Sequence, residues 1–124
     1  MKTIIPFFLL FTLILLTAGC KKADREVFIR VHNDNADLFE EVVVNTSGGE
    51  HDYGDIEAHA YSVYERFDFA YNYAFVSLKI DGKDFSLIPT DYVGEKELRS
   101  GYYTYIIRVT SYDTGSLSLE IEKD

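Results

Sequence analysis

The sequence predicts an all-β domain, a small antiparallel β-sandwich of about six to eight strands. The 124 residues include ten tyrosines and nine phenylalanines but only two prolines, and aromatic residues favour strands. Apolar and polar residues alternate along several short segments, as they do in strands with one buried face. Clusters of Asn, Asp, Gly and Ser separate these segments, as turns do. We therefore expect one domain over residues 26–124.

The first half of this range is expected to hold three strands. Residues Glu26–Asn33 alternate, with an apolar side chain at every second position. The cluster Asn33–Asp37 predicts a turn, because Asn and Asp side chains hydrogen-bond to nearby backbone groups. A second strand is expected over Leu38–Thr46, where three consecutive valines leave the inward face undecided. A short third strand is expected around Tyr53–Ile56.

The middle of the chain is its most aromatic part. Strands are expected over Tyr61–Phe69 and Tyr71–Ile80, but the apolar residues change from odd to even positions along them. A strand of period two cannot bury both sets on one face. We therefore expect a bend or bulge near Ala70–Ala74.

A β-hairpin is predicted immediately after this region. Asp81 and Gly82 are typical of a type I′ turn, in which both central residues need positive φ. Pro89 should end the second strand, because proline has no N–H for the ladder. A two-residue loop sets the register: Ile80 pairs with Lys83, Leu78 with Phe85, and Val76 with Leu87.

The last third is expected to hold a connection and two strands. The connection covers Thr90–Ser100, with one helical turn at Glu95–Leu98. A long strand follows over Gly101–Val109, with apolar residues at alternate positions. After a turn at Asp113–Gly115, residues Leu117–Glu122 alternate between apolar and polar, so this strand has one apolar and one wet face.

The segment Leu98–Tyr105 reads Leu-Arg-Ser-Gly-Tyr-Tyr-Thr-Tyr. It resembles the L-x-x-G-x-Y-x-Y strand start of immunoglobulin-like and transthyretin-like sandwiches in exported bacterial proteins. The resemblance implies a fold only, since such folds carry many functions.

Residues Met1–Gly19 have the organisation of a secretion signal. Lys2 supplies a positive start, and an apolar run over Ile4–Leu16 follows. Small residues at 17–19 precede Cys20. The apolar run is too short for a retained membrane helix, which needs about 20 residues.

Cys20 is the one cysteine of the chain. The segment Leu16–Cys20 resembles the lipobox of bacterial type II signal peptides: Ala18, Gly19 and Cys20 match, and Thr17 stands where Leu is usual. The resemblance implies cleavage before Cys20, a diacylglyceryl thioether on its sulfur and an acylated amine. The membrane, reached through this lipid, is then the first partner. The alternative is an ordinary signal peptide with a cysteine nearby by chance.

Residues 20–25 are expected to form the lipidated N-terminus and a short tether. Its five residues after Cys20 reach about 17 Å when extended, so the domain is held close to the membrane. Lys21 stands where enteric lipoproteins kept at the inner membrane have Asp, and this resemblance favours the outer membrane. Whether the domain faces the periplasm or the cell surface stays open.

The charge balance bears on the partners. Only Lys2 of the 12 basic and 21 acidic side chains lies in the signal segment, which leaves 11 basic against 21 acidic residues. An acidic surface repels phosphate backbones, so no nucleic acid is expected as a partner. It also repels anionic lipid headgroups, so the domain should stand off the bilayer.

Two polar clusters are candidate metal sites. Asn33–Asp37 offers oxygen ligands but lacks the glycine and the spaced carboxylates of an EF-hand loop, so turn chemistry is favoured over calcium binding. His51, Asp52 and His59 lack the spacing of known zinc sites, and hydrated loop residues are favoured there. We expect no metal and no cofactor.

Catalysis requires a nucleophile, a base and an orienting group. The sequence has no Gly-x-Ser-x-Gly, and its three histidines have no catalytic context. A carboxylate pair such as Asp91 with Glu95 suits glycoside hydrolysis, but 21 acidic residues make some such pair expected by chance. No catalytic residues are therefore expected.

Four tyrosines are the best candidates for a binding surface: Tyr61, Tyr64, Tyr71 and Tyr73. Large rigid rings give contact area at low entropic cost. Three hypotheses follow. The first is a lipid-anchored, non-catalytic module that binds or scaffolds an envelope partner. The second is a carbohydrate-binding accessory module that uses the tyrosines, although the chain has no tryptophan. The third is a small hydrolase.

Overall fold

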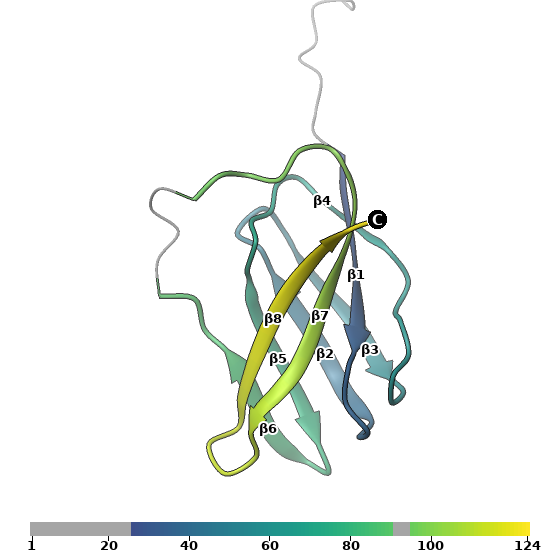
Figure 1. The fold of residues 1–124 in the computed structure, drawn as a ribbon, viewed down its shortest axis with the longest axis vertical. Coiled ribbons are helices and arrows are strands. Elements are labelled where there is room, and N and C mark those ends of the chain that lie inside the picture. The colour runs from purple at the N-terminus through teal and green to yellow at the C-terminus, as the bar shows by residue number, and fades with distance from the viewer. Residues whose placement is uncertain (1–25, 91–94) are drawn as a thin grey trace, which may run out of the picture.

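Eight strands form one hydrogen-bonded sheet in the order β3-β2-β5-β6-β8-β7-β1-β4 (Figure 1). The structure, a computed structural model, describes residues 26–90 and 95–124. The all-β prediction is confirmed. The strands are β1 (Val27–Asn33), β2 (Phe39–Asn45), β3 (Glu50–Ile56), β4 (Glu65–Phe67), β5 (Phe75–Ile80), β6 (Lys83–Leu87), β7 (Gly101–Ser111) and β8 (Ser116–Lys123).

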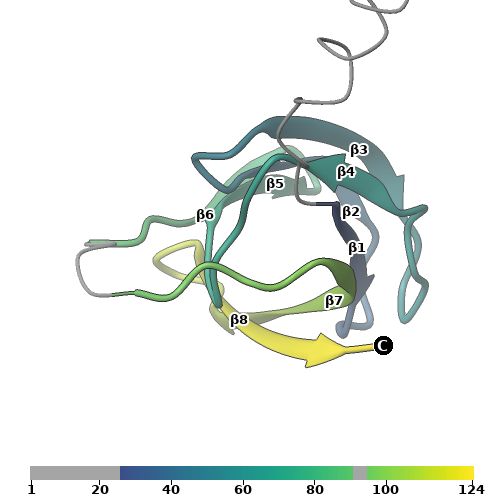
Figure 2. The same cartoon turned by 90° about the horizontal axis from the view of Figure 1, so that it is seen from above.

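The sheet curves round a common interior, as the view from above shows (Figure 2). The inward side chains of the strands fill this interior. They include Val27, Ile29 and Val31 of β1, Phe85 of β6, and Tyr105 and Ile107 of β7, all at most 2% exposed. The alternation that the sequence shows in these strands is therefore the alternation between core and solvent.

The predicted hairpin is present with its predicted register. Ile80 pairs with Lys83, Leu78 with Phe85, and Val76 with Leu87. Asp81 and Gly82 have φ values of 50° and 78°, as a type I′ turn requires.

The structure also shows which of the three consecutive valines of β2 face the core. Val42 and Val44 are fully buried, so Val43 points outward. Glu41 has a φ of 51°, and the register of β2 shifts between Glu40 and Val43. A bulge at this point sets which valines enter the core.

Two pairings differ from the predicted antiparallel arrangement. Strand β1 pairs with β7 in parallel along its whole length, and β6 pairs with β8 in parallel at Ser86 and Ser116. Parallel partners need long crossover connections, which leave no local signal in the sequence.

The aromatic middle of the chain holds less strand than predicted. The strand expected over Tyr61–Phe69 is reduced to β4, and the strand expected from Tyr71 begins at Phe75. Between them the backbone leaves the sheet, because the Ala70 carbonyl accepts from the Leu98 N–H at 2.8 Å and Ala70 is fully buried. This is the bend expected near Ala70–Ala74.

The helical turn expected over Glu95–Leu98 is wrong. Residues 95–98 are not helical, since the Leu98 N–H donates across the fold to Ala70. In the parts of the chain that the structure describes, no helix is long and apolar enough to cross a membrane. The predicted signal peptide over 1–19, the lipidation site Cys20, the tether over 20–25 and Asp91 lie outside the described residues.

Candidate functional site

The outer face of β1 and β7 carries a group of aromatic and basic side chains. Because Val27, Ile29 and Val31 are buried, the intervening side chains of β1 point outward. The parallel register sets Phe28 beside Tyr102 and Arg30 beside Thr104. The loop before β4 adds Tyr61 and Tyr64. The aromatic–arginine face consists of Phe28, Arg30, His32, Tyr61, Tyr64 and Tyr102.

These side chains contact one another in an unbroken chain. Phe28 stacks on Tyr102, with ring centroids 4.8 Å apart, and Tyr102 meets Tyr64 edge-on at 5.0 Å. The Arg30 guanidinium lies 4.3 Å from the Tyr61 ring centre and 5.0 Å from that of Tyr64. His32 then stacks on Tyr61 at 4.1 Å. Tyr61 and Tyr102 remain 54% and 50% exposed.

Polar contacts fix the centre of this face. Arg30 Nε donates to Thr104 Oγ1 at 3.0 Å and lies 3.6 Å from Asp124 Oδ2. The Asp124 carboxylate also accepts from Thr104 Oγ1 at 2.8 Å and from the Tyr64 hydroxyl at 2.6 Å. The hydrogen bond to Asp124, with burial second, raises the pKa of Tyr64. Arg30 is therefore held by two rings and two oxygens before any partner arrives.

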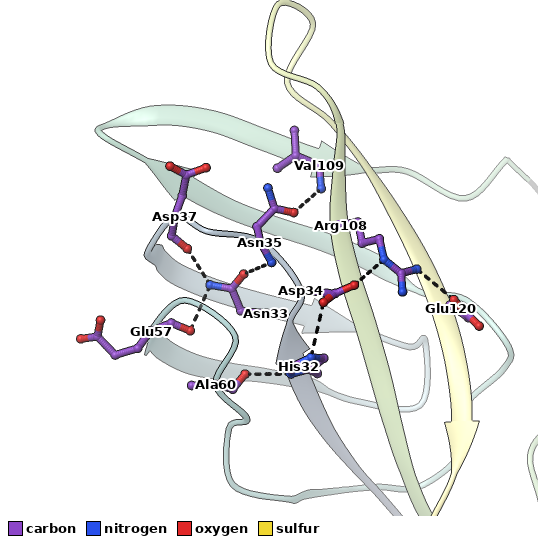
Figure 3. A network of polar contacts seen from close by, with 10 residues as sticks. All are labelled: His32, Asn33, Asp34, Asn35, Asp37, Glu57, Ala60, Arg108, Val109 and Glu120. Carbon is purple, nitrogen blue, oxygen red and sulfur yellow. Dashed lines mark hydrogen bonds and ion pairs between the residues drawn. The ribbon is translucent and has the colours of Figure 1, made fainter.

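A row of charges borders the aromatic–arginine face at the far end of β1 (Figure 3). His32 Nδ1 lies 3.2 Å from the Ala60 carbonyl, and His32 Nε2 lies 3.7 Å from Asp34. Arg108 bonds Asp34 at 2.5 Å and Glu120 at 2.9 Å. These two carboxylates raise the pKa of Arg108 through their hydrogen bonds. The row ties β1 to β7 and β8.

The Asn33–Asp37 cluster is a turn, as predicted. The Asn33 side-chain nitrogen lies within 3.1 Å of the carbonyls of Asp37 and Glu57 (Figure 3) and 3.0 Å from that of Ile56. Its oxygen accepts from the Asn35 N–H at 2.9 Å, and the Asn35 oxygen accepts from the Val109 N–H at 2.9 Å. The side-chain oxygens of Asn33 and Asn35 thus accept from backbone groups, and the carboxylates of Asp34 and Asp37 accept from Arg108 and from the Tyr112 hydroxyl.

His51, Asp52 and His59 do not form one group. His51 belongs to β3 and its ring contacts β4, with Nε2 2.7 Å from the Arg66 carbonyl and Nδ1 3.5 Å from Glu65. Asp52 accepts from the Gly54 N–H, and His59 is exposed at a turn with a φ of 60°. Over residues 26–90 and 95–124, no three His, Cys, Asp or Glu side chains are grouped as metal ligands.

The four candidate tyrosines fall into two places. Tyr61 and Tyr64 belong to the aromatic–arginine face. Tyr71 and Tyr73 lie in the segment between β4 and β5 and are half-buried. The Tyr71 carbonyl accepts from the Tyr105 hydroxyl at 2.6 Å, and the Tyr73 hydroxyl donates to Glu95. The partner predicted for Glu95, Asp91, lies outside the described residues.

Phe28, Arg30, His32 and Tyr102 were not among the sequence-predicted site residues. The alternation of Glu26–Asn33 does place the first three on the outward face of a strand. The pairing of β1 with β7 brings Tyr102 beside them, and it joins residues 74 positions apart. No local pattern contains that information.

Comparison with known proteins gives the fold alone. No family model matches the chain, and no curated protein matches it. Among solved structures, the chain is similar to an NMR structure of a protein from Eubacterium rectale, with a TM-score of 0.54 and 13% sequence identity. The match covers 86% of this chain and 97% of that one.

Proposed function

We propose that this protein is a lipid-anchored, non-catalytic module of the bacterial cell envelope that binds a partner protein. Its binding surface is the aromatic–arginine face. The single observation behind this assignment is the unbroken set of ring and guanidinium contacts from Phe28 to His32, half-exposed and fixed by Asp124. Tyrosine and arginine are the residues most enriched at the centres of protein interfaces.

The arrangement of the rings favours a protein over a glycan. A sugar stacks on an open ring face, whereas Phe28 and Tyr102 cover each other with only 12° between their planes. Tyr61 is likewise covered by His32 and approached by Arg30. Ring edges, hydroxyl groups and the guanidinium are then left for a partner, and such groups suit the mixed polar and apolar surface of a protein.

The anchor is proposed from the sequence. Lipid on Cys20 and a tether of five residues would hold this face within a few nanometres of the membrane. By the resemblance to enteric lipoproteins, Lys21 favours the outer membrane. The excess of acidic side chains would keep the domain off anionic headgroups and leave the face free for a neighbour in the envelope.

We further propose that the fold works as a sandwich of two four-stranded halves, β3-β2-β5-β6 and β8-β7-β1-β4. Its support is the weak link between the halves, in which β6 and β8 share one pair, Ser86 with Ser116. Immunoglobulin-like and transthyretin-like domains have two such sheets.

Photo-crosslinking in intact cells tests the binding surface. A benzophenone amino acid replaces Tyr102, at the centre of the face, or Asp81, in the exposed hairpin turn as the control. We expect a discrete, protease-sensitive adduct from position 102 only. Arg30→Ala should weaken that adduct, whereas Lys79→Ala, which removes an exposed basic side chain of β5, should leave it unchanged.

Two results would contradict the proposal. Adducts of the same pattern from positions 102 and 81 would mean that the aromatic–arginine face is not a specific site. A position-102 adduct that resists protease and is lost on glycosidase treatment would replace the partner protein with a glycan.

A further inference from the structure

The sheet has one long open edge among the described strands, on β8. The two ends of the strand order, β3 and β4, are closed against each other by His51 and by the Tyr53 hydroxyl, which donates to Ile29 of β1. Strand β8 pairs with β7 along its length but meets β6 only at Ser116. Beyond that pair, β7 is the one described strand that pairs with β8, and the other side of β8 has no partner among the described strands.

The ladder identifies which groups of β8 face the open side. The Asp124 N–H donates to Tyr102 of β7 at 2.9 Å. Hydrogen-bonded pairs alternate along an antiparallel ladder, so Glu122 and Glu120 also direct their backbone groups to β7. The backbone groups of Leu119, Ile121 and Lys123 therefore point away from β7. No described residue pairs with them.

The side chains along this edge agree with the absence of a covering strand among residues 26–90 and 95–124. Leu117, beside the contact with β6, is 5% exposed, whereas Leu119 and Ile121 point inward and are only partly buried. The chain leaving β6 runs away from β8 (Figure 1). A cavity of about 300 Å³ opens between the two strands, and its lining includes Leu87, Ile88 and Leu119. Ile88 is 68% exposed.

We propose that this edge accepts an extended, basic segment of a partner protein as an additional strand. Backbone groups of Leu119, Ile121 and Lys123 would pair with it, and alternate apolar side chains would enter the cavity beside Leu87 and Leu119. Its other side chains would lie beside Glu120 and Glu122, on the wet face of β8. Lysine or arginine at those positions matches the charge of Glu122, and also that of Glu120, which already bonds Arg108.

A second copy of this chain fits less well. Two β8 edges paired about a two-fold axis would bring Glu120 and Glu122 of both copies together, on a chain with a net charge of −9. The open edge adjoins the aromatic–arginine face at Glu122, which pairs with Thr104 of β7. The methylated peptides below report on the backbone edge of β8 and so distinguish the two surfaces.

The test uses a synthetic ten-residue peptide that alternates lysine and valine, titrated into the full mature chain. We expect saturable binding with slowed amide hydrogen exchange at Leu119, Ile121 and Lys123. Two further peptides carry N-methyl groups on all valines or on all lysines, which blocks one backbone edge each. In an added strand that is antiparallel to β8 and has its valines toward the cavity, the valine N–H groups face β8. The valine-methylated peptide should therefore bind at least about tenfold more weakly than the lysine-methylated one.

Charge is tested on the protein. Glu122→Lys should weaken peptide binding about two- to fivefold, and Glu57→Lys, at an exposed loop position, should not. Absence of binding, equal binding of the two methylated peptides, or protection away from β8 would each overturn the proposal. Concentration-dependent dimers with the same protection and no peptide binding would assign the edge to a second copy instead.

Discussion

Asn33 is fully buried, and its side chain joins the end of β1 to two loops. Its side-chain nitrogen donates to backbone carbonyls of Asp37, Ile56 and Glu57, and its side-chain oxygen accepts from the Asn35 N–H. Asn33→Ala leaves these groups without partners inside the protein. We expect the free energy of unfolding to fall by about 2–4 kcal/mol, because each unsatisfied buried group costs about 1–3 kcal/mol. Urea denaturation measures it, with Asn72→Ala, at an exposed position, as the control within about 0.5 kcal/mol.

Tyr53 makes the stability of the folded state depend on pH in the alkaline range. Its hydroxyl donates to the Ile29 carbonyl at 2.6 Å, and burial, with Glu65 and Tyr105 as smaller contributors, raises the pKa of Tyr53 well above its usual value. The folded state thus favours the neutral ring. The stabilisation that follows is complete below pH about 10, where the unfolded chain titrates, and is lost as pH rises beyond it.

Tyr53→Phe should remove this dependence. The free energy of unfolding, measured by urea denaturation between pH about 8 and 11, should fall more steeply in the natural protein above pH about 10. The difference between the slopes of the two proteins should approach 1.4 kcal/mol per pH unit, the value for one proton. At neutral pH the variant should lose about 1 kcal/mol for the missing hydrogen bond. Parallel profiles above pH about 10 would show that Tyr53 ionises as freely in the folded state as in the unfolded one.

At the scale of the elements, two glycines are required for different reasons, one for its backbone conformation and one for lack of space. Gly82, in the β5–β6 turn, has a φ of 78° and open space around it, so Gly82→Ala costs only backbone strain, about 1–2 kcal/mol. Gly48 packs against the segment after β4, and a Cβ there would lie 2.1 Å from the Phe69 carbonyl oxygen. Gly48→Ala should therefore cost more, about 3 kcal/mol. Thermal unfolding compares the two variants, and a smaller loss for Gly48→Ala would show that β4 and its following segment can move aside.

Elements that depend on neighbouring residues were predictable from the sequence. The register of the β5–β6 hairpin follows from Asp81-Gly82, and the core positions of β1 and β7 follow from their alternation. The short β4 was not predictable, since the backbone groups that follow it bond residues far away in the sequence: Asp68 bonds Gly48, Ala70 bonds Leu98 and Tyr71 bonds Tyr105. The pattern of neighbouring residues does not predict hydrogen-bond partners that are so distant in the sequence.

The same distinction applies to the candidate site. Tyr61 and Tyr64 were identified because they lie in an aromatic stretch of sequence. Arg30 and Tyr102 were missed, because their role depends on the parallel pairing of β1 with β7. Tyr71 and Tyr73 belong to the same aromatic stretch as Tyr61, but the bend at Ala70 takes them to another part of the fold.

At the scale of the whole molecule, the proposed surfaces matter only if the chain is held where partners are. One lipid chain binds a membrane marginally, at about 0.8 kcal/mol per buried methylene, and two or three chains bind it durably. Cys20 is the one cysteine in the chain, so any thioether-linked lipid must be on it. We expect Cys20→Ala to abolish labelling by a fatty-acid analogue and to move the protein from the membrane fraction to the soluble fraction. Lys21→Asp is the matched control: it should keep label and membrane association and, by the resemblance to enteric lipoproteins, shift the protein toward the inner membrane. A Cys20→Ala protein that still sediments with the membrane, unlabelled, would show that something other than lipid holds it there.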